Sequence, residues 1–138
     1  QMCIRDSSIT LPNGMAGSTL IAVLGYAGVF QSAKLAYAAQ AGTALTQKKK
    51  VDHVGLVAYD MHPLALTIGQ NFEVMDALPQ IEEGAQVAAS TIWSEYDEPM
   101  IEIPGEWDTD SRLCLLALAP YPVKIGAAVV SVTTNEKV

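Results

Sequence analysis

Apolar and β-branched runs, each about the length of a strand, alternate along the chain with breaks of proline, glycine or acidic residues. Val51–Tyr59 ends at Asp60, and Met100–Ile103 alternates before a Pro-Gly pair. Arg112–Ala119 and Val123–Thr133 flank a Pro-Tyr-Pro corner. Such runs between such breaks favour buried strands over helices. The pattern predicts an all-β fold, in which the last two runs pair as an antiparallel hairpin across the corner.

Two other stretches have some helical character. Ser32–Leu45 is rich in alanine, the best helix former, but Gly42 and Thr43 interrupt it. Phe30 and Ser32 alternate with Val29 and Gln31 as in a strand, so we expect a strand followed by a loop. Glu73–Leu78 has room for one helical turn before a proline. The surrounding stretch, Gln70–Glu98, is expected to be one long acidic loop region. The fold predicted from these elements is an antiparallel β-sandwich or barrel-like domain.

The 138 residues suffice for one domain with a hydrophobic core. Gln1–Ser7 resembles a translated sequencing-adapter remnant of the kind found at the ends of metagenomic contigs, so we expect residues 1–7 to be non-native. Residues 8–138 are then expected to form a single all-β domain, the C-terminal fragment of a larger protein.

Composition and charge narrow the function classes. Hydrophobic residues make up 50% of the chain and charged residues 17%, which excludes intrinsic disorder and suggests that something outside the chain covers part of its apolar surface. The net charge of −7 disfavours sequence-specific nucleic-acid binding. Gly14–Phe30 is uncharged, but it holds four glycines and lacks an adjacent basic flank, so no membrane anchor is expected.

The charges fall into zones along the chain. Between Ser7 and Gln47 the only charged residue is Lys34. Between Val51 and Ser111 there is no Lys or Arg, whereas Asp and Glu number thirteen. The simplest interpretation of the acidic zone is a solvated acidic face.

The usual catalytic and metal-binding patterns are missing from the sequence. There is no Gly-x-Ser-x-Gly elbow, and no lysine precedes Ser18 as a phosphate loop requires. His53 follows Asp52, but neighbours in a strand point to opposite faces, and His62 lies in a Met-His-Pro loop. Cys114 lies in an apolar run and is expected to be buried and unreactive. We therefore expect no enzyme, no cofactor and no metal site.

Three alternatives remain open for the polar and aromatic residues. The acids of Glu95–Glu98 and Asp108–Asp110 could supply calcium ligands, although no EF-hand spacing is present. The same carboxylates leave a small hydrolase as an unfavoured alternative. A carbohydrate- or receptor-binding module is the third, because sugar rings stack on exposed aromatic faces. Its candidate stacking residues are Trp93, Tyr96 and Trp107.

The basic run at the start of one predicted strand has two interpretations. It could contact a neighbouring subunit or passing DNA. It could equally protect the end of an edge strand against aggregation. The residues concerned are Lys48, Lys49 and Lys50.

Four motifs, in this order, resemble a known family. They are a Gly-aromatic opening with a following strand, a basic entry into the next strand, a Pro-Gly-x-Trp-Asp-x-Asp-x-Arg corner, and a Pro-x-Pro followed by an apolar strand. The residues are Leu24–Leu35, Lys48–Val54, Ile103–Leu113 and Ala119–Ile125. Together they resemble the C-terminal β domain of podovirus tail nozzle proteins, known as tail tubular protein B, and of related virion proteins. The chain departs from many relatives in having only Gly42 between the second strand and the basic run.

The resemblance implies a virion structural protein without catalytic residues. In such tails a ring of subunits extends the channel through which DNA leaves the capsid. The implied partners are copies of the chain, other tail proteins and DNA passing without sequence specificity. The implied location is the phage tail, and the host cytoplasm during assembly. An acidic wall would repel the DNA backbone, and the nearly uncharged first third would be covered by other protein.

Overall fold

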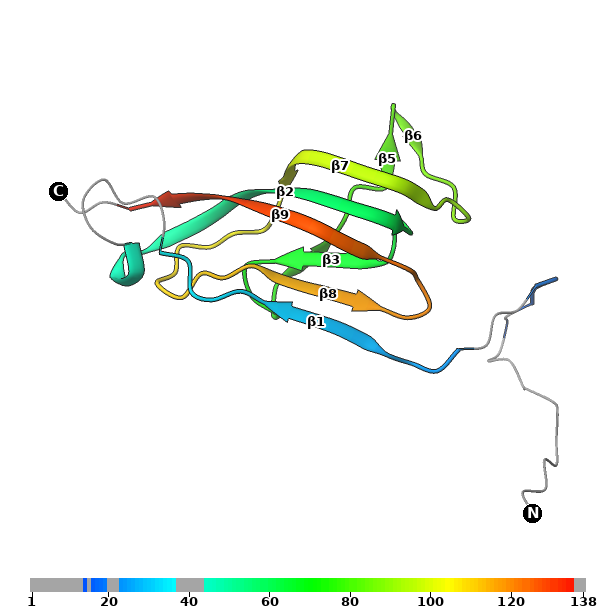
Figure 1. Ribbon diagram of the computed structural model, residues 1–138, viewed down its shortest axis with the longest axis horizontal. Coiled ribbons are helices and arrows are strands. Elements are labelled where there is room, and N and C mark those ends of the chain that lie inside the picture. Colours follow the sequence, from blue (N-terminus) through cyan, green and yellow to red (C-terminus); the bar gives the residue numbers. More distant parts are fainter. Residues whose placement is uncertain (1–13, 15, 20–22, 37–43, 136–138) are drawn as a thin grey trace, which may run out of the picture.

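The computed structural model describes residues 14, 16–19, 23–36 and 44–135. Figure 1 shows an elongated body in which the longer strands run along the long axis, while one short hairpin stands across it. The elements are β1 (Ala27–Gln31), a 3-10 turn (Ala44–Thr46), β2 (Lys49–Met61), β3 (Leu66–Gly69), β4 (Met75–Ala77), β5 (Ile81–Glu82), β6 (Ala85–Gln86), β7 (Trp93–Glu102), β8 (Cys114–Leu118) and β9 (Lys124–Thr134).

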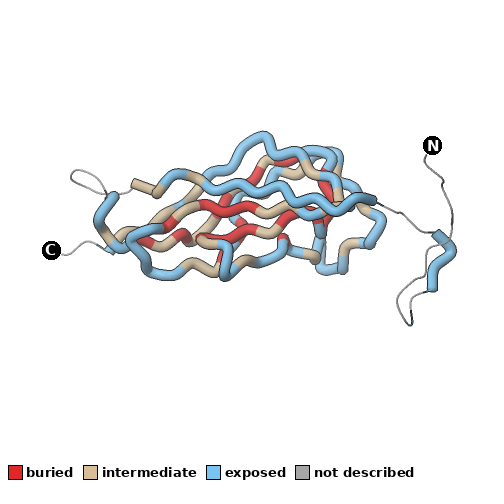
Figure 2. Tube along the Cα trace, turned by 90° about the horizontal axis from the view of Figure 1, so that it is seen from below, coloured by how far each residue is buried: buried red, intermediate tan, exposed pale blue. Residues whose placement is uncertain are grey.

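Two antiparallel sheets face each other. One has the order β1-β8-β3-β4 and the other the order β7-β2-β9, while β5 and β6 form a separate hairpin. Buried segments run through the middle of the body between exposed outer strands (Figure 2). The prediction of an all-β, sandwich-like fold is confirmed. Among the described residues no helix has the length and apolarity to cross a membrane.

The central strand β2 shows why this sequence forms a two-layered fold. Val54, Leu56 and Ala58 alternate with less buried residues and face the core, as expected for a strand covered on one face. Val51 is buried as well, because the register against β9 shifts between Val51 and His53 and so changes which residues face inward.

The core lies between the two sheets. It is aliphatic, and Trp93, Tyr96 and other partly buried side chains pack around it. Its buried members are Val51, Val54, Leu56, Ala58, Met61, Ala65, Leu66, Ile68, Leu78, Ile101, Ile103, Leu113 and Leu115.

The predicted hairpin of the last two apolar runs is wrong. Both runs are strands, but β8 pairs with β1 and β3, whereas β9 pairs with β2 in the other sheet. Because β8 has a neighbour on each side, neither of its edges is open to β9. The corner at Pro120-Tyr121-Pro122 therefore carries the chain from one sheet to the other.

The acidic segment also differs from the predicted loop. Within residues 70–98 the structure places β4, the β5–β6 hairpin and the first half of β7. The expected helical turn at Glu73–Leu78 is wrong, because its middle is the strand β4 paired with β3. Glu83 and Gly84, both with positive φ, form the two-residue turn between β5 and β6.

The first third of the chain agrees with its prediction where it is described. The expected strand is β1, paired with β8. Residues 32–36 continue from it without regular structure. The glycine and threonine expected to interrupt a helix, Gly42 and Thr43, lie outside the described residues.

Candidate functional site

The three consecutive lysines lie in different environments. Lys48 is exposed, Lys50 is partly buried, and Lys49 is completely buried. Lys49 and Lys50 begin β2, and Lys48 directly precedes it. Because β2 is the central strand of its sheet, the interpretation as protection of an edge strand is wrong. Since Lys49 has no exposed surface, it is not available to a partner or to DNA, and only Lys48 and Lys50 remain candidates for such contacts.

The ammonium group of Lys49 is held by backbone carbonyl groups. Its Nζ donates to the carbonyl oxygens of Ala44 at 2.9 Å, Gln47 at 3.2 Å and Thr109 at 2.7 Å. These three bonds use all three N–H donors of the ammonium. The backbone of Lys49 also exchanges two hydrogen bonds with that of Asp108. Lys49 thus ties the start of β2 to the turn before it and to the corner between β7 and β8.

Gln70 and Ser111 extend this buried polar network. The Gln70 side chain accepts from the Val51 N–H at 3.1 Å and donates to the Glu106 carbonyl at 2.7 Å and to Ser111 Oγ at 2.8 Å. The Ser111 hydroxyl lies 2.8 Å from the Lys49 carbonyl oxygen. The network satisfies the polar atoms of all three buried side chains and joins both sheets to the Pro-Gly-x-Trp-Asp corner.

Electrostatics at the network follow from burial and neighbouring charges. Burial lowers the pKa of Lys49, Lys34 lowers it further, and Asp110 and Asp108 act in the opposite direction. Hydrogen bonding from the Asp110 backbone N–H holds the pKa of Asp108 below its usual value. A buried lysine whose three ammonium donors are all used within the chain suits a structural role.

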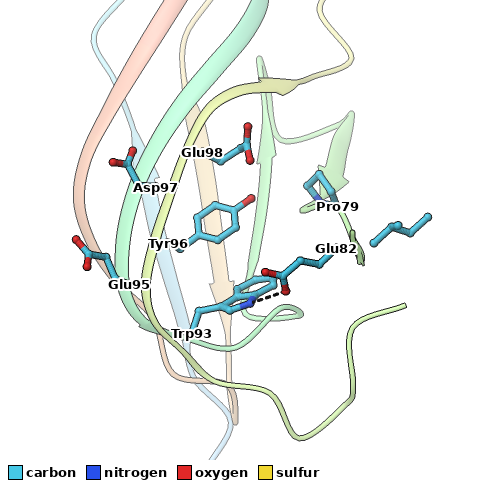
Figure 3. Close-up of a pocket in the computed structure, with 8 residues that line it drawn as sticks. Pro79, Glu82, Trp93, Glu95, Tyr96, Asp97 and Glu98 are labelled. Atoms are coloured by element: carbon cyan, nitrogen blue, oxygen red, sulfur yellow. Dashed lines mark hydrogen bonds between the residues drawn. The ribbon is translucent and has the colours of Figure 1, made fainter. Parts of the chain in front are cut away.

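Two of the three candidate aromatic residues come together in a pocket. The rings of Trp93 and Tyr96 lie 4.9 Å apart between centroids at the start of β7. With Pro79 and Ile81 they line a hollow of about 250 Å³ between β7 and the β5–β6 hairpin. Figure 3 shows the Trp93 indole nitrogen reaching Glu82, at 3.4 Å from Oε2.

The carboxylates around this pocket divide between two directions. Glu98 and Tyr96 extend from β7 toward the hairpin, whereas Glu95 and Asp97 extend from the opposite face of the strand (Figure 3). Burial raises the pKa of Tyr96 to about 12, with smaller contributions from Glu98 and Glu82. The phenol is therefore neutral and available as a hydrogen-bond donor over the physiological range.

The third aromatic residue lies elsewhere. Trp107 is about half exposed and sits in the corner beside Asp108, away from the residues that line the Trp93 pocket. The structure therefore does not form one stacking platform from all three residues. Of the three candidates, only Trp93 and Tyr96 can act together on one sugar ring.

The histidines, the thiol and the acids do not form a reactive group in the described structure. His62 Nδ1 accepts from the Leu64 N–H, so its proton lies on Nε2 and is donated to the Ala89 carbonyl at 2.8 Å. His62 also stacks on Tyr121. Cys114 is buried, as expected. No three His, Cys, Asp or Glu side chains of the described ranges are placed to hold a metal ion.

An apolar groove is the feature that the sequence did not reveal. It lies between the two sheets on the side of β1 and β9, and its larger part has a volume of about 460 Å³. Phe30 of β1 and Ile125, Ala128 and Val130 of β9 line it, with Leu115 of β8 between them. A second hollow continues it along Val29 and Val123. Groups from both sheets meet here only after folding, so no local pattern indicates it.

Comparison with known proteins identified no relative. No family model, no curated protein and no solved structure matches the chain.

Proposed function

We propose that this chain is a structural subunit of a phage tail, in the nozzle or tubular part, and that it works through subunit contacts and not by catalysis. The observation that carries the proposal is the difference between the two sides of the sandwich. One side, at β7, is acidic, and the other, at β1 and β9, is uncharged and apolar over most of its length. The four motifs that resemble tail nozzle proteins support the phage setting.

The acidic side suits a wall past which DNA slides. β7 carries Glu95, Asp97, Glu98 and Glu102, and the neighbouring β5–β6 hairpin contributes further acids. Duplex DNA is a dense line of negative charge, so a wall of the same sign does not retain it. A ring with this side turned toward its axis would conduct the genome without binding it.

The uncharged side suits contact with protein. Val29 and Phe30 of β1 and Val129 of β9 are each more than half exposed, and an apolar groove separates the two strands. Apolar areas of this kind usually mark an interface. In the proposed ring this side contacts another subunit or another tail protein.

Negative-stain electron microscopy of the purified chain tests the ring. We expect rings with an axial channel at high protein concentration. Particles that contain no ring at any concentration would contradict the proposal.

A pair of charge reversals tests which side faces the channel. In assembled rings, Glu95→Lys should cause retention of duplex DNA at low salt, because it places a cation on the acidic side. Glu106→Lys, at another exposed glutamate that lies in the corner, is the matched control and should not cause retention. Equal retention by the two variants would exclude an acidic channel wall.

A second candidate function is a carbohydrate- or receptor-binding module, favoured by the pocket of Trp93 and Tyr96. An aromatic pair beside carboxylates can stack on a sugar ring and accept its hydroxyl protons. A glycan array would show specific binding that Trp93→Ala abolishes and Trp107→Ala preserves. Absence of specific binding by the unaltered chain would reject this candidate.

A further inference from the structure

The two outer strands of the β7-β2-β9 sheet differ in the features that prevent edge-to-edge pairing. β7 carries four carboxylates and Pro99. β9 has no proline, and its one charged residue, Lys124, lies at its first position. Lys124 also forms an ion pair within the chain, because its Nζ lies 2.6 Å from Asp60 Oδ2. Charges, prolines and bulges on edge strands protect against pairing with another chain. β7 has all three, whereas β9 has only a bulge at Gly126, beside its first residues, so β9 is much the less protected strand.

The less protected strand is long and suited to pairing. From Ile125 to Thr134 it presents glycine, alanine, valine, serine and threonine, several of them β-branched. Among the described strands its one neighbour is β2. Ten residues of extended chain span roughly 34 Å. Such a strand is a ready template for a further strand.

The neighbouring surface adds apolar area to this edge. β1 is the outer strand of the other sheet, on the same side of the molecule as β9, since residues of both line the apolar groove. β1 is also uncharged, and Phe30 is 51% exposed. The β9 edge, the groove and β1 together form what we term the open side.

We propose that the occupant of the open side is a second copy of this chain, with the β9 strands of the two copies paired antiparallel. The middle of β9 carries no charges that would repel an identical strand, so two copies of β9 can pair with each other. Two copies of β7 would instead place carboxylate against carboxylate. A two-fold axis near Val129 and Val130, the middle of Ile125–Thr134, gives the longest overlap.

This arrangement has defined consequences for the fold. It joins two three-stranded sheets into one continuous sheet of six strands, with a protected β7 at each outer edge. It also brings the two grooves together, so that Phe30 and Ile125 of each copy approach the partner. The isologous contact closes on itself and yields a dimer whose two β7 edges point away from each other. A ring would need a different contact in addition, and only one β7 edge of each dimer could then face the channel.

Sedimentation velocity of the full chain and two matched variants tests the inference. We expect a concentration-dependent dimer for the unaltered chain. Val129→Lys should raise the dimer dissociation constant at least about tenfold, because it places two ammonium groups against each other near the axis. Met100→Lys, on the other edge strand with a similarly exposed side chain, should leave it unchanged. A chain that stays monomeric, or a Val129→Lys variant that dimerises normally, would overturn the inference.

Cross-linking supplies a readout that does not depend on the stability of a charged variant. In a Cys3→Ser background, which keeps the buried Cys114, one cysteine is added at a time at Ala127, Val129 or Ser131. The intermolecular disulfide should form fastest at the position nearest the axis. A cysteine at Met100 should not form one. Equal cross-linking at all four positions would contradict pairing through β9.

The inference rests on the proposed role in subunit contacts, yet its failure can be distinguished from failure of that role. Rings that survive Val129→Lys would refute the β9 contact and keep the tail function. A β9-linked dimer that never forms rings would keep the contact and refute the tail function.

Discussion

The ammonium group of Lys49 donates a hydrogen bond of 2.7 Å to the backbone carbonyl of Thr109, a residue 60 positions later in the chain. This bond fixes the corner between β7 and β8 to the first residue of β2. Only a long side chain with several donors can reach that carbonyl and those of Ala44 and Gln47 together. The middle lysine of a basic run is thus a structural clamp within the domain.

Replacing that lysine should destabilise the fold. Lys49→Met keeps most of the side-chain volume but removes the three hydrogen bonds that the ammonium donates to the carbonyls of Ala44, Gln47 and Thr109. The Ala44 carbonyl keeps the Gln47 N–H as a donor. We expect the free energy of unfolding to fall by about 2–4 kcal/mol, measured by urea denaturation with tryptophan fluorescence. Lys48→Met, at an exposed neighbour, should change it by less than about 0.5 kcal/mol. Equal effects of the two substitutions would show that the clamp does not stabilise the fold.

Gly105 should not tolerate a side chain. A Cβ atom at this position would collide with the backbone carbonyl oxygen of Val51, which is held within β2 and cannot move aside. We expect Gly105→Ala to lower the free energy of unfolding by about 1–3 kcal/mol, which a lower thermal midpoint would show. Gly25→Ala, where no described atom lies within 4 Å, is the control and should have little effect. A stable Gly105→Ala protein would mean that the corner lies farther from β2 than described.

The strands themselves could be predicted from the sequence because their patterns are local. Val51–Tyr59 lies within β2, and β8 and β9 lie close to the predicted apolar runs. Pairing was harder to predict, because a strand with hydrogen-bond partners on both sides looks the same in sequence as one half of a hairpin. The same applies to the register shift that buries Val51 beside Val54, since a bulge breaks the two-residue period without a sequence signal.

The candidate site was predictable only in part, for a related reason. A lysine in a basic run is normally exposed to solvent. Nothing near Lys49 in the sequence predicts that its ammonium group binds the carbonyls of Ala44 and Thr109. Trp93 and Tyr96 are three residues apart, so a regular strand would point them to opposite faces, yet their rings meet at the beginning of β7. Contacts between distant segments determine both outcomes.

Tyr96 provides a pH dependence with a definite sign. Burial and the nearby acids raise the pKa of Tyr96 to about 12 in the folded protein, whereas the unfolded phenol titrates near its usual pKa of 10. The resulting stability is fully present below about pH 10 and is lost as the pH rises through about 12.

Between pH 10 and 11 the unaltered chain should therefore lose stability relative to Tyr96→Phe, which lacks this ionisation. Because the ring is only half buried, solvent screening limits the difference to less than about 1 kcal/mol. Urea denaturation of both proteins at pH 9, 10 and 11 measures it. Parallel stability curves would show that the phenol is as exposed as in the unfolded chain.

Cys114 should resist alkylation in the folded protein. Its side chain is fully buried, and burial raises the pKa of the thiol, while the Gln31 hydrogen bond and Arg112 only partly oppose that effect. The thiolate is the reactive form, so both exposure and ionisation are suppressed at neutral pH. We expect the rate at which iodoacetamide modifies Cys114 to be lower in buffer than in denaturant by roughly two orders of magnitude or more. Modification in buffer requires opening of the β1–β8 pair. Mass spectrometry of the peptide that contains Cys114 separates this signal from that of Cys3. Rapid labelling under native conditions would mean that β1 detaches easily from the sheet, and would also weaken the open side as a rigid surface for a second copy.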